Sequence, residues 1–149
     1  MKKIKTLRFG EIEEDENKIV RFAQGMPAFE GEHEFILILQ DMESPYVFLQ
    51  SVRTPELAFL MTRPYVFFPD YEFTLPDAVL EQLAIKKQED LDVYTLITIP
   101  DGSIQRMTTN LLAPVVINKQ NREAQQVVLE KTHYTTKHAL FPDKTKGDK

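Results

Sequence analysis

Residues 108–118 read TTNLLAPVVIN, and this stretch decides how the fold is interpreted. Asn110 is of a residue type that hydrogen-bonds its own backbone in turns. Pro114 suits the first residue of a strand or an edge position, because it has no backbone N–H to donate to a neighbouring strand. Residues 115–117 are β-branched and apolar on both faces, which is typical of a buried strand. The stretch therefore predicts a polar turn followed by a core strand, and it contains no catalytic pattern.

Short strand-like segments continue on both sides of this stretch. They lie at residues 2–9, 18–22, 35–39, 46–52, 57–62, 91–99, 104–108 and 126–129. Residues 11–16 form either a hairpin tip or the start of a further strand, and residues 100–102 (PDG) are a hairpin turn signal. Helical spacing occurs at residues 76–83, with one short turn at 88–90. The pattern predicts an all-β dominated fold, a small antiparallel β-barrel or sandwich with one or two short helices.

The length of 149 residues favours one domain. We expect residues 1–141 to form it, and residues 142–149, which are small, polar and charged, to be a disordered tail. No apolar stretch approaches the roughly 18 residues that span a bilayer. The basic N-terminus is not followed by the apolar core of a signal peptide. Together with the absence of cysteine, these features predict a cytoplasmic protein without a membrane association.

The formal net charge of −5 conceals an uneven distribution. Residues 1–10 carry four basic and no acidic side chains, residues 11–100 carry six basic and 18 acidic ones, and residues 101–149 carry eight basic and five acidic ones. Nucleic acids attract the opposite charge, so we expect no direct RNA or DNA binding. An acidic region would steer a basic protein partner instead. The alternative is that these acids only keep the domain soluble.

Motifs of catalytic and metal sites are missing from the sequence. His133 and His138 are five residues apart, which matches neither one helix face nor one strand face, so a shared metal is not expected. There is no HExxH, Walker loop, GxGxxG or nucleophile elbow. We therefore expect a protein that is not an enzyme and that binds neither cofactor nor metal.

The aromatic segment at residues 65–73 has two interpretations. Aromatic side chains more often fill a core than form a binding surface. Here, however, Pro64 and Pro69 interrupt the segment, and Asp70 and Glu72 separate its rings. Aromatic rings beside acids on an irregular edge suit a protein interface, in which rings anchor and acids steer. The residues that we predict to bind a partner here are Phe68, Asp70, Tyr71 and Glu72.

Two loops supply the remaining candidates for a partner site. In the loop Gly25–Phe29, Phe29 is expected to plug one end of the barrel, whereas Met26 is either part of that plug or an exposed anchor. Asn110, with Thr108 and Thr109, is a candidate exposed contact, because loops on a rigid scaffold often carry binding residues. Met26 and Asn110 are therefore included among the predicted partner-binding residues.

The order of several runs gives the chain a family resemblance. The runs are residues 22–30 (FAQGMPAFE), 44–52 (SPYVFLQSV), 57–59 (LAF), 70–73 (DYEF), 109–118 (TNLLAPVVIN) and 134–138 (YTTKH). In this order, and from about Phe9 to Phe141, the chain resembles the bacterial flagellar assembly factor FliW family. Two positions depart from the family pattern. Ala28 stands where the family usually has a glycine, so it would be strained if that position has φ > 0. Ala139 stands where the family has proline.

The resemblance implies a function without catalysis. Proteins of this family bind the translational repressor CsrA, which then no longer represses flagellin mRNA, and accumulating flagellin competes for the same protein and releases CsrA. The resemblance also implies an antiparallel β-barrel with small helical insertions and a protein that is monomeric when free. CsrA binds RNA and should present a basic surface, which fits the acidic middle region of this chain. An adaptor that binds flagellin only, without any link to translation, is the alternative.

Overall fold

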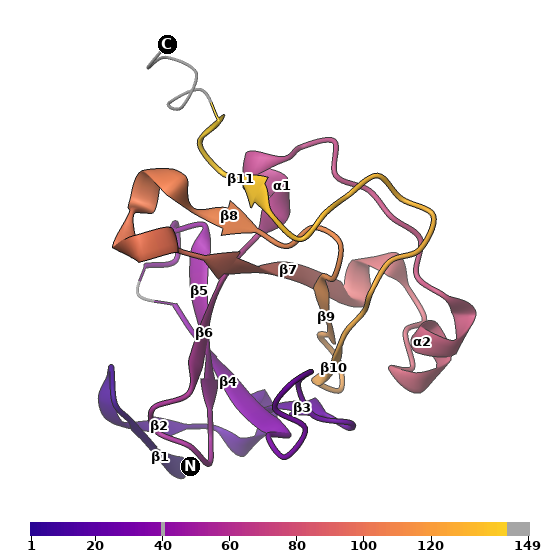
Figure 1. The fold of residues 1–149 in the computed structure, drawn as a ribbon. Helices are drawn as coiled ribbons and strands as arrows, with labels where there is room; N and C mark the ends of the chain where they lie inside the picture. The colour runs from indigo at the N-terminus through magenta and orange to yellow at the C-terminus, as the bar shows by residue number, and fades with distance from the viewer. Residues whose placement is uncertain (40, 143–149) are drawn as a thin grey trace.

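The computed structural model describes residues 1–39 and 41–142 and is dominated by β-strands (Figure 1). The strands are β1 Lys2–Thr6, β2 Gly10–Glu14, β3 Val20–Phe22, β4 Glu34–Ile38, β5 Tyr46–Ser51, β6 Ala58–Thr62, β7 Leu91–Thr98, β8 Thr108–Thr109, β9 Val115–Asn118, β10 Glu123–Gln126 and β11 His138–Ala139. The helices are α1 Pro64–Phe67 and α2 Asp77–Gln82, with 3-10 turns η1 Glu16–Lys18, η2 Gln88–Asp90, η3 Pro100–Gly102 and η4 Ile104–Arg106.

Seven strands close into a barrel. Their order is β7-β6-β5-β4-β3-β10-β9, and β9 pairs back with β7 to complete the ring. All pairs in the ring are antiparallel except β3 with β10, which is parallel. The predicted antiparallel barrel is thus confirmed, with one parallel pair that the sequence pattern did not indicate. Figure 1 shows the β1–β2 hairpin at one end of the ring and α1, β8 and β11 at the other.

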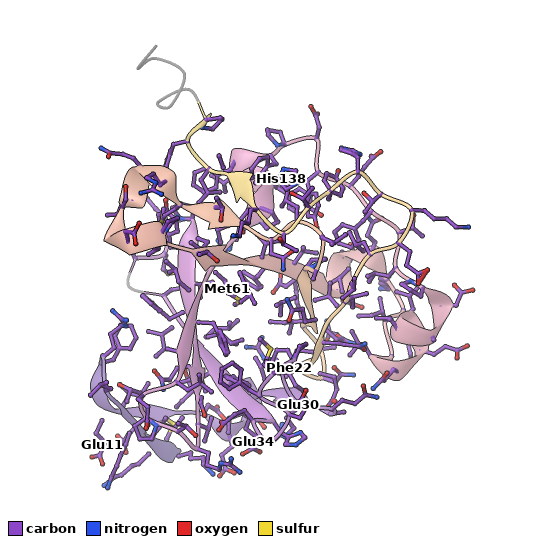
Figure 2. The ribbon with its side chains drawn as sticks, in the orientation of Figure 1. Glu11, Phe22, Glu30, Glu34, Met61 and His138 are labelled. Atoms are coloured by element: carbon purple, nitrogen blue, oxygen red, sulfur yellow. The ribbon has the colours of Figure 1, made fainter. Side chains whose placement is uncertain are left out.

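The barrel interior is filled by side chains from every strand of the ring. Phe22 and Met61 lie inside it, as Figure 2 shows, and both are almost completely buried. Phe22 packs edge-on against Phe35, with ring centroids 5.3 Å apart. This continuous apolar interior makes the barrel a packed core rather than a channel.

A second apolar cluster explains why β9 is apolar on both faces. Val115 and Ile117 point into the barrel core, whereas Val116 belongs to a cluster with Val79 and Leu83 of the α2 region. These three β9 side chains are all 0% exposed. Helix α2 therefore covers the outer face of β9, and the buried strand that the sequence predicted at residues 115–117 is confirmed.

The β1–β2 hairpin places charges of opposite sign across from one another. Lys3 is opposite Glu13, and Lys5 is opposite Glu11, in the antiparallel register. Opposite charges at facing positions stabilise a strand pair. The basic N-terminal strand thus lies against part of the acidic region, so the negative charge of residues 11–100 is not one continuous surface.

Two predicted strands differ from the structure. Residues 104–106 form the exposed turn η4 instead of a returning strand, because Asp101 at φ 49° and Gly102 at φ 72° bend the connection before a ladder can start. Of the expected returning strand at residues 104–108, only Thr108 lies in a strand, β8, which pairs with β7. Of the strand expected at residues 126–129, only Gln126 is in a strand: β10 covers Glu123–Gln126 instead, because residues 124–126 pair with β9 and residues 123–124 pair with β3. The tail expected to start at residue 142 lies outside the described residues from residue 143 onward.

Candidate functional site

The segment that we predicted to bind a partner begins directly after α1. Pro64 occupies the first turn of α1, where its missing N–H has no helical acceptor to lose. The Phe68 N–H then donates to the Pro64 carbonyl at 2.8 Å, and the Tyr71 N–H donates to the Phe68 carbonyl at 3.0 Å. These turns end the helix and leave Asp70 exposed. Helix α1 was not predicted, although Pro64 was a usable signal for a helix start.

Tyr71 is buried, which corrects the expected partial exposure of this residue. Its side chain is only 4% exposed, and its hydroxyl donates to the Leu111 carbonyl oxygen at 2.7 Å. Burial is the main cause that raises the pKa of Tyr71, and the neighbouring Tyr65 and Tyr134 add to it. The hydroxyl therefore stays protonated and remains a donor. Tyr71 fixes the segment to the loop before β9 and is not itself available to a partner.

Tyr134 links the C-terminal segment to this anchor. Its ring packs edge-on against Tyr71, with centroids 4.8 Å apart. Its hydroxyl oxygen accepts a hydrogen bond from the Glu72 backbone N–H at 3.1 Å. The backbone at Glu72, whose side chain is exposed, is thereby held next to Tyr134. Three runs that are far apart in the sequence, at residues 70–73, 109–118 and 134–138, meet around one tyrosine.

His138 and Phe68 complete the aromatic cluster. Their rings lie 5.9 Å apart in an edge-on arrangement. The Thr135 backbone N–H donates to His138 Nε2 at 2.9 Å, so this nitrogen acts as an acceptor. Burial, and then the nearby His133, lower the pKa of His138. The imidazole is therefore neutral at pH 7 and serves to close the turn at residues 135–138.

These residues line a groove of about 670 Å³, which we call the Tyr71 groove. One wall is formed by residues 67–72 and the other by residues 131–134 with His138, while Leu111 contributes to the floor. Asp70 and Glu72 are exposed on the first wall, and neither forms an ion pair with another described residue. Lys131 lies on the opposite wall. The groove can therefore present free carboxylates and aromatic edges to a partner.

Asn110 has a structural role in the loop below the groove. Its side-chain oxygen accepts hydrogen bonds from the Leu112 N–H at 3.1 Å and the Ala113 N–H at 3.0 Å, which confirms the predicted turn. The neighbouring Thr109 is only 1% exposed, and its hydroxyl donates to Thr95 Oγ1 at 2.7 Å. Thr109 is therefore not the exposed contact that we expected, because its side chain is used to join β8 to β7.

The Met26 loop contradicts the expectation that Phe29 plugs the barrel and decides between the two interpretations of Met26. Met26 is 1% exposed and belongs to the barrel core, whereas Phe29 is 42% exposed and packs edge-on against Phe59. The Phe29 N–H donates to the Met26 carbonyl at 2.7 Å, and Ala28 lies at φ 71° within this turn. The tight turn points Met26 inward and Phe29 outward. Met26 does not line the Tyr71 groove and cannot be an exposed anchor in this conformation.

Within residues 1–39 and 41–142, no group of three or more histidine, cysteine, aspartate or glutamate side chains is placed to hold a metal ion. In the same residues, no helix is both long and apolar enough to cross a membrane. The groups that converge in the Tyr71 groove are rings, carboxylates and one lysine, which suit contact with a protein surface.

Comparison with known proteins identifies the same family that the sequence runs around Tyr71 resemble. Residues 3–140 match the family model described as FliW protein. The chain belongs to the FliW family. The flagellar assembly factor FliW of Geobacillus kaustophilus is 46% identical over 143 residues, covering 95% of this chain and 97% of that protein. The protein of the same name from Heliobacterium modesticaldum is 44% identical over 140 residues, covering 94% of this chain and 91% of that protein.

A solved structure shows the same fold. The crystal structure of a flagellar assembly factor FliW is 45% identical in sequence, has a TM-score of 0.87, and covers 95% of this chain and 98% of that one. The FliW runs quoted from the sequence thus fall on a shared backbone. Tyr134, His138 and Lys131 were not predicted as site residues, although residues 134–138 had been recognised as a FliW run. Their proximity to Tyr71 depends on tertiary structure, which spacing along the chain does not reveal.

Proposed function

We propose that this protein is a flagellar assembly factor that binds CsrA and relieves its repression of flagellin mRNA, with flagellin as the competing partner. The proposed function consists of binding and involves no catalysed reaction. The observation that carries the proposal is the pair of exposed, unpaired carboxylates of Asp70 and Glu72 on a wall that buried Tyr71 holds in place. The proposal draws on the FliW family membership for the identity of the partners.

The physical basis is charge complementarity on a rigid support. CsrA binds RNA, so it should carry a basic surface that carboxylates attract. Because the backbone between Asp70 and Glu72 is held by the bonds of Tyr71 and Tyr134, little backbone ordering is needed when a partner docks. Once docked, the net-negative protein would repel RNA phosphates from the neighbourhood of its partner. Inhibition would then not require the protein to enter the RNA-binding groove of CsrA.

Acidic residues occur in the Tyr71 groove and also at the opposite end of the molecule, and this makes the proposal testable. Figure 2 shows Glu11, Glu30 and Glu34 at the end of the molecule opposite His138. Asp70 and Glu72 share the Tyr71 groove with His138. A charge change at one place can therefore be compared with an equal charge change at the other.

The experiment compares the double variant Asp70→Lys with Glu72→Lys against the control Glu16→Lys with Glu43→Lys, since both pairs are exposed and change the net charge equally. CsrA binding is measured by calorimetry at several salt concentrations. We expect the groove variant to lose about tenfold or more in affinity and part of its salt dependence, and the control to keep both. Equal behaviour of the two folded variants would contradict the assignment of the CsrA face.

The alternative function, an adaptor for flagellin only, is distinguished by a second measurement. Immobilised protein is loaded with purified CsrA and then exposed to purified flagellin. Under our proposal CsrA is captured and flagellin displaces it. Capture of flagellin with no capture of CsrA at low salt would favour the adaptor.

A further inference from the structure

A second groove, of about 730 Å³, lies between the α2 region and the N-terminal half of β7, and we call it the β7 groove. Apolar side chains line much of it, among them Leu80, Ile85, Leu91 and Val93. The Tyr71 groove is lined by different residues. The function proposed above makes no use of the β7 groove.

One edge of β7 is unpaired in this groove. On one side, Leu91 to Tyr94 pair with β9. On the other side, β6 reaches only Leu96 and Thr95 of β7. The chain of β6 then turns away, because the Arg63 N–H donates to the Pro45 carbonyl at 3.1 Å. Among the described residues, no strand therefore pairs with residues 91–94 on the β6 side, and alternate residues there direct their backbone N–H and C=O groups outward.

The rim of the β7 groove carries positive charge within the acidic part of the chain. Arg63, Lys86 and Lys87 line it, although residues 11–100 contain only six basic side chains. None of the three forms an ion pair within residues 1–39 and 41–142. The lining acid Asp92 lies 3.6 Å from Lys119, which lies outside the groove lining. The groove is therefore lined by three unpaired cations and one acid that has a partner elsewhere.

We propose that the β7 groove binds a short extended segment of a partner protein that carries large apolar and acidic side chains, by strand addition to β7. The unpaired edge would supply main-chain hydrogen bonds, the apolar lining would take alternate side chains, and the three cations would select carboxylates. The residues 143–149 of this chain (DKTKGDK) carry three lysines against two aspartates, which is the wrong charge for such a segment. The proposal stands whether or not CsrA binds at the Tyr71 groove.

The first test uses the full chain and synthetic octapeptides in which leucine alternates with glutamate. A second peptide replaces glutamate by lysine, and a third is the acidic peptide with alternate backbone nitrogens methylated. NMR titration should show binding of the acidic peptide only, with amide shifts and exchange protection concentrated at residues 91–94. No binding at about 1 mM acidic peptide, or equal binding of the methylated peptide, would overturn the proposal.

The second test changes the charge of the rim. The variant Lys86→Glu with Lys87→Glu should weaken the acidic peptide about tenfold or more, whereas Lys18→Glu with Lys137→Glu, an equal charge change at exposed residues outside the groove, should not. Equal affinities would overturn the proposal. Binding to phosphatidylglycerol vesicles instead of the peptide would assign the groove to a lipid surface. Self-association that the rim variant abolishes would assign it to a second copy of the chain.

Discussion

The hydroxyl of Tyr71 donates a 2.7 Å hydrogen bond to the carbonyl oxygen of Leu111, 40 residues further along the chain. This bond connects the segment after α1 to the loop that leads into β9. It places the two exposed acids on either side of Tyr71, so the proposed partner site depends on a residue that no partner touches.

Replacing Tyr71 by phenylalanine should destabilise the fold. The ring packing would remain, but the buried Leu111 carbonyl would lose its partner, which costs about 1–3 kcal/mol. Denaturant unfolding monitored by circular dichroism measures the change. Tyr65→Phe is the control, because Tyr65 is 44% exposed and its hydroxyl makes no hydrogen bond to a described residue. A Tyr71→Phe protein as stable as this control would show that the bond contributes nothing.

Replacing Ala28 by glycine should stabilise the protein. Ala28 lies at φ 71°, where a side chain costs roughly 1–2 kcal/mol, and glycine would relieve this strain. Part of the relief is lost because glycine has more conformational freedom in the unfolded chain. We expect a net increase of about 0.5–1 kcal/mol, seen as a higher thermal midpoint. Gly25→Ala should destabilise the protein, since Gly25 has φ 77° and the added Cβ would collide with the Glu30 backbone carbonyl. A decrease in stability on Ala28→Gly would disprove strain at this position.

Glu32 should make the fold sensitive to acid. Its carboxylate is buried and accepts hydrogen bonds of 2.6 Å from both Ser51 and Thr54. These two bonds are the main cause that holds the pKa of Glu32 below its ordinary value of 4.5, and Arg53 helps. A pKa that folding lowers gives stability that is present above pH 4.5 and is lost as pH falls through the folded-state pKa.

The measurement is the free energy of unfolding between about pH 7 and pH 3. Glu32→Gln should lower stability at pH 7 by about 1–3 kcal/mol and flatten the pH dependence below pH 4.5. Glu34→Gln is the matched control, because the Glu34 carboxylate is 43% exposed and its ion pair with the exposed Arg21 is long, at 3.7 Å. If stability still falls at low pH to the same extent in Glu32→Gln, that fall must arise from other carboxylates.

Asn118 should fasten helix α2 to the barrel. Its side-chain amide donates to the Leu83 carbonyl at 2.7 Å and the Ala84 carbonyl at 3.2 Å, just beyond the end of α2, and it is 2% exposed. Asn118→Ala should cost about 1–3 kcal/mol and increase amide exchange in α2. The control Asn121→Ala removes a 3.1 Å bond to the Leu83 carbonyl and a 2.9 Å bond from the Glu123 N–H, both made by an exposed side chain, and should cost less. Equal effects would mean that burial of Asn118 adds nothing.

The local part of the fold could be predicted from the sequence. Residues 115–117 were identified as a buried strand because they are apolar on both faces, and the structure shows that the barrel covers one face and α2 the other. Helix α2 and the turn η2 lie where spacing placed them. The parallel pair β3–β10 was missed, since nothing within either strand specifies which distant strand it will join.

The candidate site could be predicted only in part, for a related reason. The pattern of rings and acids at residues 65–73 located the right segment, but it did not distinguish the exposed Asp70 and Glu72 from the buried Tyr71. That distinction depends on Leu111 and Tyr134, which the fold brings from far along the chain. In the same way, the turn at Ala28 decides which of Met26 and Phe29 faces inward.

The parallel pairing of β3 with β10 has a consequence for folding during synthesis. Arg21 lies opposite Glu123, so this pairing of the ring joins strands that are about 100 residues apart in the chain. Pairs of such long separation make folding slow, because a large loop must be ordered before the contact forms. While the ribosome makes the intervening residues, β3 has one unpaired edge and the barrel interior is open to solvent. The nascent chain therefore passes through a partly folded, aggregation-prone state that lasts until β10 has been synthesised.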